Sequence, residues 1–250
     1  MPIRSLLLTL LLTSLLACWS DQKTANTNLP DTLANQAAVT LDSSGTGEDI
    51  AYENATRLLG IGLVFAPDTV TVYADSLLTG QFATVYGHSL GEAPPDWLRP
   101  LFYKPDYDIL HFVCLKQTAK AYEVLTDGQA IRYLPRRRGY EYISWPAYLM
   151  QSHGVRRKDL EDGPPNQPLR RLPAINAKPV AVPSGLEMFC VMQVKGDLIQ
   201  VRYDCFYNRD PNPHEGEPCS EYIQKCPATT QGWLRWRAKD KLLVDVFTMP

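Results

Sequence analysis

The chain has 250 residues, of which 45% are hydrophobic and 21% are charged, with 20 prolines, 15 glycines and 6 cysteines. This apolar fraction is ordinary for a folded protein and excludes disorder over the whole chain. A formal net charge of -2 at pH 7 gives no reason to expect a nucleic-acid partner, because such proteins are usually clearly basic. After the N-terminus, no apolar run reaches the roughly 18 residues of a membrane-spanning helix, which excludes a polytopic membrane protein.

The N-terminus carries the strongest signal in the sequence. Arg4 precedes an apolar stretch, Leu6–Leu16, that is about as long as the hydrophobic region of a secretory signal peptide. The sequence Leu15-Leu16-Ala17-Cys18 resembles the lipobox of bacterial lipoproteins. The resemblance implies removal of residues 1–17 as a signal peptide and acylation of Cys18.

Acylation of Cys18 would tie the protein to a membrane on the exported side of the bacterial cell envelope. Two or three acyl chains make a stable anchor, because each buried methylene contributes about 0.8 kcal/mol. The alternative is an ordinary cleaved secretory peptide, and both interpretations export the chain. The polar composition that follows is typical of a solvated, flexible tether, which would run over residues 18–47.

The rest of the chain predicts one helix followed by many strands. Residues 48–59 have the apolar spacing of an amphipathic helix, with acidic residues in the first turn and Gly60 as a stop. The later pattern is short β-rich runs separated by Pro, Gly, Asp and Asn. Strands are expected over 69–73, 82–86, 109–115, 121–125, 131–134, 140–145, 187–194, 198–203, 232–237 and 242–247. The fold class is therefore mainly β with one short N-terminal helix.

Composition also suggests a division of the chain after the tether. Six prolines with few apolar residues between them indicate a linker over 161–183. It separates a first unit, 48–160, from a second unit, 184–250. A polar insert, 204–231, interrupts the second unit.

Three segments of the second unit carry a second resemblance. Residues 196–201 read GDLIQV, residues 232–236 read GWLRW and residues 242–245 read LLVD. This order is similar to bacterial SH3-like domains, specifically to SH3-like lipoproteins of unassigned role. The resemblance covers residues 186–247, and more weakly residues 63–150, and implies two small SH3-like barrels. Such barrels host many binding roles, so the resemblance implies no reaction.

The aromatic residues of the first unit are candidates for lining a binding groove, as on SH3-type surfaces, although Tyr and Trp also pack protein cores. They are Trp97, Tyr103, Tyr107, Trp145 and Tyr148. We therefore predict a non-catalytic, lipid-anchored binding module for a peptide, a cell-wall component or an envelope protein, without a cofactor. A structural subunit that makes contact through residues 204–231 is a third possibility.

One motif points instead to a reaction. Residues 87–91 read GHSLG and match the G-x-S-x-G nucleophile elbow, so the alternative function is a small serine esterase using Ser89. The elbow requires a helix after its serine, but Pro94 and Pro95 fall where that helix would run. Proline costs about 3 kcal/mol inside a helix. A tight turn is therefore the favoured interpretation.

The cysteines other than Cys18 are expected to include disulfides, since an exported protein meets an oxidising compartment. The insert holds Cys205, Cys219 and Cys226. Either Cys205–Cys219 or Cys205–Cys226 could form a disulfide, and Cys190 could pair with the cysteine that remains. Cys114 lies in an apolar run and is expected to be a buried free thiol. A zinc site on the three insert cysteines and His214 lacks the usual C-x₂-C spacing, so no metal is expected.

Two runs of three cations are the densest positive segments of the chain. They are Arg136–Arg138 and Arg156–Lys158. Either run could contact anionic lipid or a cell-wall polymer, and either could be a solvated loop.

Overall fold

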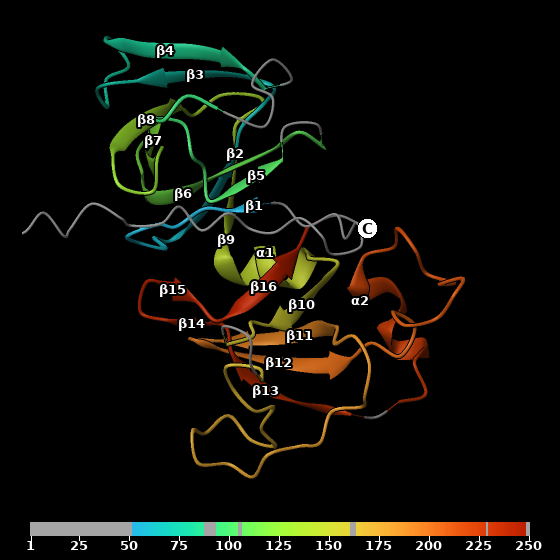
Figure 1. Ribbon diagram of the computed structural model, residues 1–250. Coiled ribbons are helices and arrows are strands. Elements are labelled where there is room, and N and C mark those ends of the chain that lie inside the picture. The colour runs from blue at the N-terminus through green and yellow to red at the C-terminus, as the bar shows by residue number, and fades with distance from the viewer. Residues whose placement is uncertain (1–51, 88–93, 105–106, 161–163, 229, 249–250) are drawn as a thin grey trace, which may run out of the picture. The chain divides into compact units, whose positions relative to one another are not determined.

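The computed structural model describes residues 52–87, 94–104, 107–160, 164–228 and 230–248. These residues belong to one compact unit that spans residues 47–250. The expected anchor at Cys18, the tether and Ser89 lie outside the described residues. Figure 1 shows that strands dominate the described part, which confirms the mainly β fold class.

A sheet of nine strands occupies the N-terminal part of this unit. Its strands are β1 (Tyr52–Glu53), β2 (Gly62–Phe65), β3 (Thr69–Tyr73), β4 (Gln81–Tyr86), β5 (Phe102–Lys104), β6 (Ile109–Gln117), β7 (Ala121–Leu125), β8 (Ile131–Pro135) and β9 (Glu141–Ser144). Along the sheet the order is β1-β5-β6-β7-β8-β3-β4, and β2 lies between β6 and β9. Strand β4 is therefore at an edge.

A second sheet has five strands in the order β13-β12-β11-β10-β16. These strands are β10 (Gly154–Arg157), β11 (Phe189–Lys195), β12 (Leu198–Tyr203), β13 (Gln231–Arg235) and β16 (Val244–Phe247), and a small separate pair is formed by β14 (Arg237–Ala238) and β15 (Lys241–Leu242). Each of the ten strands expected from the sequence is present. In the described residues neither sheet closes into a barrel, and the SH3-like assignment stays a prediction.

Two short α-helices and one 3₁₀ turn complete the described elements. They are α1 (Trp145–Gln151), α2 (Cys219–Tyr222) and η3 (Ile223–Lys225). The Oγ of Ser144 accepts a hydrogen bond from the Ala147 amide at 3.4 Å, and a proline occupies the first turn of α1. These are standard features of a helix start, and they end the expected strand at Ser144. Neither described helix has the length and apolar character needed to span a bilayer.

The helix expected over 48–59 is wrong over its described part, residues 52–59. Strand β1 instead pairs with β5, and the Arg57 amide donates to the Gly128 carbonyl at 2.9 Å. Gly128 has a φ of +82°, and a Cβ there would lie 2.1 Å from the carbonyl oxygen of Ala55. Only glycine permits this approach. Hydrogen bonds to distant segments therefore override the amphipathic pattern.

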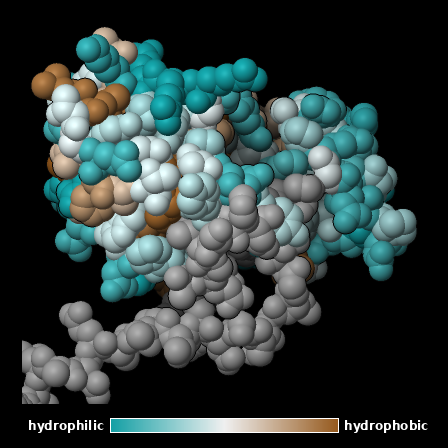
Figure 2. Space-filling model, turned by 90° about the horizontal axis from the view of Figure 1, so that it is seen from above, coloured by the Kyte–Doolittle hydropathy of each residue, from teal (hydrophilic) through white to brown (hydrophobic). Residues whose placement is uncertain are grey.

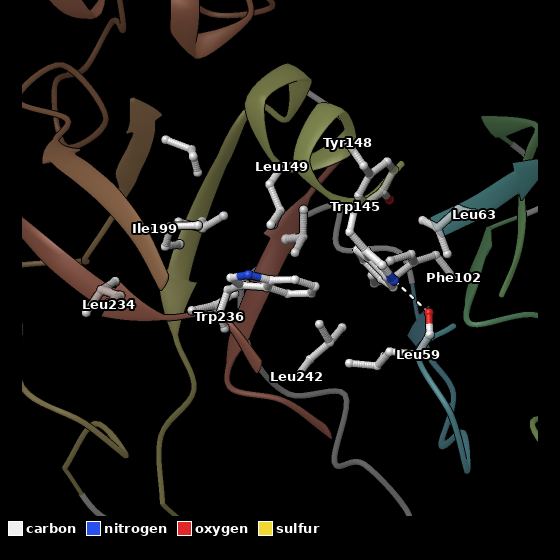
Figure 3. Packing of buried hydrophobic residues seen from close by; sticks show 14 of the residues in the cluster. Leu59, Leu63, Phe102, Trp145, Tyr148, Leu149, Ile199, Leu234, Trp236 and Leu242 are labelled. Atoms are coloured by element: carbon white, nitrogen blue, oxygen red, sulfur yellow. Dashed lines mark hydrogen bonds between the residues drawn. The ribbon is translucent and has the colours of Figure 1, made fainter. Parts of the chain in front are cut away.

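The two sheets share one hydrophobic core (Figure 3). The indole rings of Trp145 and Trp236 lie 5.3 Å apart between their centroids, and both residues are 2% exposed. The Trp145 indole N–H donates to the Leu59 carbonyl at 2.6 Å, as the dashed line in Figure 3 shows. Side chains from both sheets, including Leu63 and Ile199, complete this core.

The structure does not divide where the sequence suggested, either at the expected linker or at the expected end of the first unit. Strand β10 falls before residue 160, yet it pairs with β11 and β16 of the second sheet. In the segment that follows, Leu169 is fully buried, and Arg170 exchanges backbone hydrogen bonds with Trp233 at 3.0 and 2.7 Å. The described part of the Pro-rich segment thus packs against β13.

Candidate functional site

The structure does not bring the five candidate aromatic residues together on one exposed surface. Tyr103, Trp145 and Tyr148 are each less than 5% exposed and belong to the hydrophobic core. Tyr107 is 51% exposed, with the Lys104 ammonium 4.2 Å from the centre of its ring. Trp97 is partly exposed and contacts a second exposed aromatic residue.

Trp97 is held at the surface by the residue that follows it. Leu98 is completely buried, and the Arg99 amide donates to the Thr126 carbonyl at 2.5 Å. These contacts fix the loop after Pro95 and leave the Trp97 ring packed against the margin of the core. A partly exposed aromatic ring is thus held in one place.

Phe82 on β4 meets Trp97 there. The two rings form an edge-to-face contact with centroids 5.1 Å apart, although Phe82 is 41% exposed. Phe82 lies at a β-bulge: Ala83 pairs with Val72 and Gln81 pairs with Tyr73, so Phe82 has no partner on β3. A large apolar side chain is thereby left at the surface.

Arg132 on β8 completes this group. Its guanidinium carbon lies 4.5 Å from the centre of the Phe82 ring, which is the range of a cation–π interaction. Its Nη1 donates to the Ile131 carbonyl at 2.8 Å, but its buried Nε has no hydrogen-bond partner among the described residues. A guanidinium beside a partly exposed aromatic ring is suited to an acidic or carboxylate-bearing ligand.

The free edge of β4 adjoins this aromatic–arginine cluster, which we define as Phe82, Trp97 and Arg132. Among the described strands, none pairs with the outer side of β4. Figure 2 looks onto this end of the molecule and shows hydrophobic side chains gathered toward one side among hydrophilic ones. The exposed large apolar residues of this region include Leu77, Phe82, Tyr86 and Ile131. The unpaired edge of β4 is thus available to a further strand.

A second aromatic group surrounds His111 but is closed to solvent. The His111 ring stacks on Phe65 with centroids 4.1 Å apart, and its Nδ1 lies 3.2 Å from the Tyr148 hydroxyl. Burial lowers the pKa of His111 to about 3, so the ring is neutral at physiological pH. Burial also raises the pKa of Tyr148 well above its ordinary value. This group packs the core and offers no surface to a ligand.

The cationic run Arg156–Lys158 is paired with carboxylates. Arg156, Arg157 and Lys158 lie on or beside β10, and their partners are Asp245, Glu187 and Glu53 respectively. Burial raises the pKa of Glu53, an effect that Lys158 partly opposes. Burial likewise raises the pKa of Asp245, again opposed by Lys158 and by Arg156.

The cysteines of the insert form the disulfides Cys190–Cys219 and Cys205–Cys226. The second pair is one of the two alternatives left open by the sequence, and Cys114 is a buried free thiol. Burial raises the pKa of the Cys114 thiol to about 12, which keeps it protonated and unreactive.

The zinc alternative would need thiolates that these disulfides do not supply. His214 is engaged elsewhere: its Nδ1 lies 3.0 Å from the Glu217 carboxylate, and its ring stacks on Tyr222 at 4.7 Å. The sulfur atoms of Cys190 and Cys219 also lie close to the buried Asp204 carboxylate. Because both sulfurs are in a disulfide, this group is not a thiolate site in the oxidised protein.

The esterase motif is described only at Gly87, whose amide donates to the Asp68 carbonyl at 2.5 Å. Residues 88–91 lie outside the described residues. Residues 94–101, where the elbow helix would continue, form turns and irregular backbone that lead into β5. The esterase function of Ser89 remains a prediction.

Comparisons with known proteins give no relative from which a function could be transferred. The chain matches no protein-family model, no curated protein and no solved structure.

Sequence analysis identified Trp97 but missed Phe82 and Arg132. The β-rich run 82–86 indicated the strand that carries Phe82 and did not indicate that the strand lies at an edge. A phenylalanine beside polar Gln81 and near Thr84 was the available signal for an outward-facing aromatic residue.

Proposed function

We propose that this protein is a non-catalytic binding module of the bacterial cell envelope, tethered to a membrane by an acylated Cys18. Its ligand is an extended peptide segment of another envelope protein, which adds as a strand to the free edge of β4. The observation that carries this proposal is the coincidence of that free edge with the aromatic–arginine cluster.

The edge and the cluster have different parts in binding. Backbone hydrogen bonds along an edge strand provide affinity for any extended segment, whereas pockets and side chains beside the edge provide selectivity. Phe82 and Trp97 offer an apolar surface to one ligand side chain. The positive charge of the Arg132 guanidinium favours an acidic group close to that side chain. The preferred ligand is therefore an extended segment with an apolar residue near a carboxylate.

A library of random peptides displayed on phage tests the binding function. Peptides selected on the wild-type protein should be rich in acidic residues and should bind about 10-fold more weakly to Phe82→Ala and to Arg132→Gln, since each change removes roughly 1–2 kcal/mol at such a contact. Leu186→Ala is the matched control, because Leu186 is 55% exposed and lies outside the cluster. Unchanged affinity in both cluster variants would place the binding site elsewhere.

The membrane tether is tested separately. Cys18→Ala should move the protein from the membrane fraction to the soluble fraction of the envelope, because the acyl chains supply the anchor. Labelled fatty acid should be incorporated into the wild-type chain and not into this variant. Absence of label from the wild-type chain would exclude the lipid anchor and leave the peptide-binding result intact.

A further inference from the structure

We propose that four exposed cations at one end of the first sheet bind the phosphate headgroups of an anionic membrane surface. They are Lys120, in the turn between β6 and β7, and Arg136, Arg137 and Arg138, in the turn between β8 and β9. All four are exposed. We refer to them as the basic turn patch.

The fold brings the two turns together. Arg136 donates its amide to the Lys120 carbonyl at 2.8 Å, and its Nη1 donates to the Thr118 carbonyl at 3.1 Å. Strands β7 and β8 pair at Ala121 and Pro135, directly beside the turns. Cations that are 16 residues apart in the sequence, Lys120 and Arg136, therefore share one surface.

Aromatic rings support two of the arginines. The Arg136 guanidinium lies 5.9 Å from the centre of the Tyr122 ring, and that of Arg137 lies 5.8 Å from the Tyr140 ring. Tyr140 is itself fixed, since it is 4% exposed and its hydroxyl accepts from the Thr71 amide at 2.8 Å. Such stacking limits the conformational freedom that these side chains would lose on binding.

The described carboxylates leave the basic turn patch without an ion pair. Across the described residues, none of its four cations forms an ion pair. The acidic residues on the adjoining strands are Glu123, which lies opposite Lys116 in the register of β6 and β7, and Glu141 at the start of β9. The chain as a whole has a formal charge of -2, so the positive charge is local and complements an anionic surface.

The choice of a membrane as the partner rests on the proposed tether at Cys18. The tether proposed over residues 18–47 has 30 residues, and a flexible chain of that length would have a root-mean-square reach of about 30 Å. At that distance the membrane is present at a high effective concentration, so weak contacts by several cations are sufficient for docking. Docking would hold the domain in one orientation on the membrane.

Vesicle co-sedimentation tests this docking independently of acylation. The full chain carrying Cys18→Ala should bind vesicles made of equal parts phosphatidylcholine and phosphatidylglycerol, and should bind vesicles of phosphatidylcholine alone much less. Adding Arg136→Gln, Arg137→Gln and Arg138→Gln should weaken binding to the anionic vesicles by about 10-fold or more. High salt should have the same effect, because it screens exposed charges.

A matched control separates the patch from net charge. The substitutions Arg171→Gln, Lys178→Gln and Lys225→Gln remove the same charge from exposed positions outside the patch, and this chain should bind as the parent does. Equal losses in both triple variants, or equal binding of the parent to both kinds of vesicle, would overturn the proposal. Because every chain in this experiment lacks Cys18, neither result depends on the lipid anchor or on peptide binding at β4.

Discussion

Two runs of three cations, separated by fewer than 20 residues of sequence, occupy opposite environments in this protein. Arg156–Lys158 lies on and next to β10, where each side chain meets a carboxylate from another element. Arg136–Arg138 lies in a turn, where its contacts among the described residues are with aromatic rings and backbone carbonyls. Arg156–Lys158 is thus part of the packing between segments, whereas Arg136–Arg138 faces solvent.

The comparison shows that position in the sheet, and not charge density, decides what a cationic run can do. Strand β10 lies inside the second sheet, between β11 and β16. Long cationic side chains on such a strand are covered by their neighbours and therefore require partners. A turn imposes no such requirement, so its cations remain available to an external anion.

The largest expected effect follows from removing one member of the most buried ion pair. Arg157 donates its Nε to Glu187 at 2.6 Å and its Nη1 to the Gln167 carbonyl at 2.8 Å, and both charged side chains are less than 15% exposed. Arg157→Met should lower the free energy of unfolding by about 3 kcal/mol, because it leaves a buried carboxylate unpaired. Urea denaturation measures this loss.

The double variant Arg157→Met/Glu187→Leu is the control for that prediction. It removes both charges and should recover a substantial part of the lost stability, since a buried ion pair can often be replaced by apolar residues. A double variant as unstable as the single one would show that packing by the arginine stem, and not the ion pair, supports β10.

Lys158→Met should have a smaller effect that depends on pH. Lys158 contacts Glu53 at 2.7 Å and opposes the burial that raises the pKa of Glu53 and of Asp245. Without Lys158, both ionised carboxylates become less favourable in the fold, and we expect a loss of about 1 kcal/mol at neutral pH.

The sign of the pH dependence follows from the raised pKa of both groups. A carboxyl whose pKa is higher in the folded chain than in the unfolded chain favours folding when it is protonated, and this contribution is lost as pH rises through the folded pKa. The destabilisation by Lys158→Met should therefore shrink near pH 4.5, the ordinary pKa of a glutamate. Urea unfolding curves of the wild type and the variant at neutral pH and at pH 4.5 measure this difference in stability. A loss of stability that grows on acidification would contradict the assigned contacts.

The smallest effect on stability is expected in the basic turn patch. Replacing Arg136, Arg137 and Arg138 together by Gln should change the free energy of unfolding by no more than about 0.5 kcal/mol, because exposed residues without ion pairs contribute little. Urea denaturation of the same protein used for vesicle binding measures this. A loss comparable to that of Arg157→Met would mean that the two runs do not differ as described.

The strand positions were predictable from the sequence, and the surroundings of individual side chains were often not. Alternating β-rich runs located β3 and β7 with their observed ends. Strand β10 was missed because Val155 is its only large apolar residue and cations follow directly. Its assignment to a sheet depends on pairing with β16, almost 90 residues later in the sequence.

Local capping signals could have corrected one further error. Ser144 and Pro146 flank Trp145 in the pattern of a helix start, and a helix places Trp145 and Tyr148 on one side, three residues apart. That side is the core, which explains why these two candidates for a binding groove are buried. The aromatic–arginine cluster was not predictable in the same way, since its members come from β4, β8 and the irregular segment before β5, which only the tertiary fold brings together.

The contact between Trp145 and Trp236 also bears on how the chain can be divided. Trp145 packs beside Leu59 and Leu63 of the N-terminal part, Trp236 packs beside Leu242 of the C-terminal part, and the two indole rings meet between these groups. A fragment cut near residue 160 would expose this apolar surface on both pieces and would leave β16 without β10. Excised halves should therefore aggregate, and evolution could not readily shuffle either half into another protein as an autonomous building block.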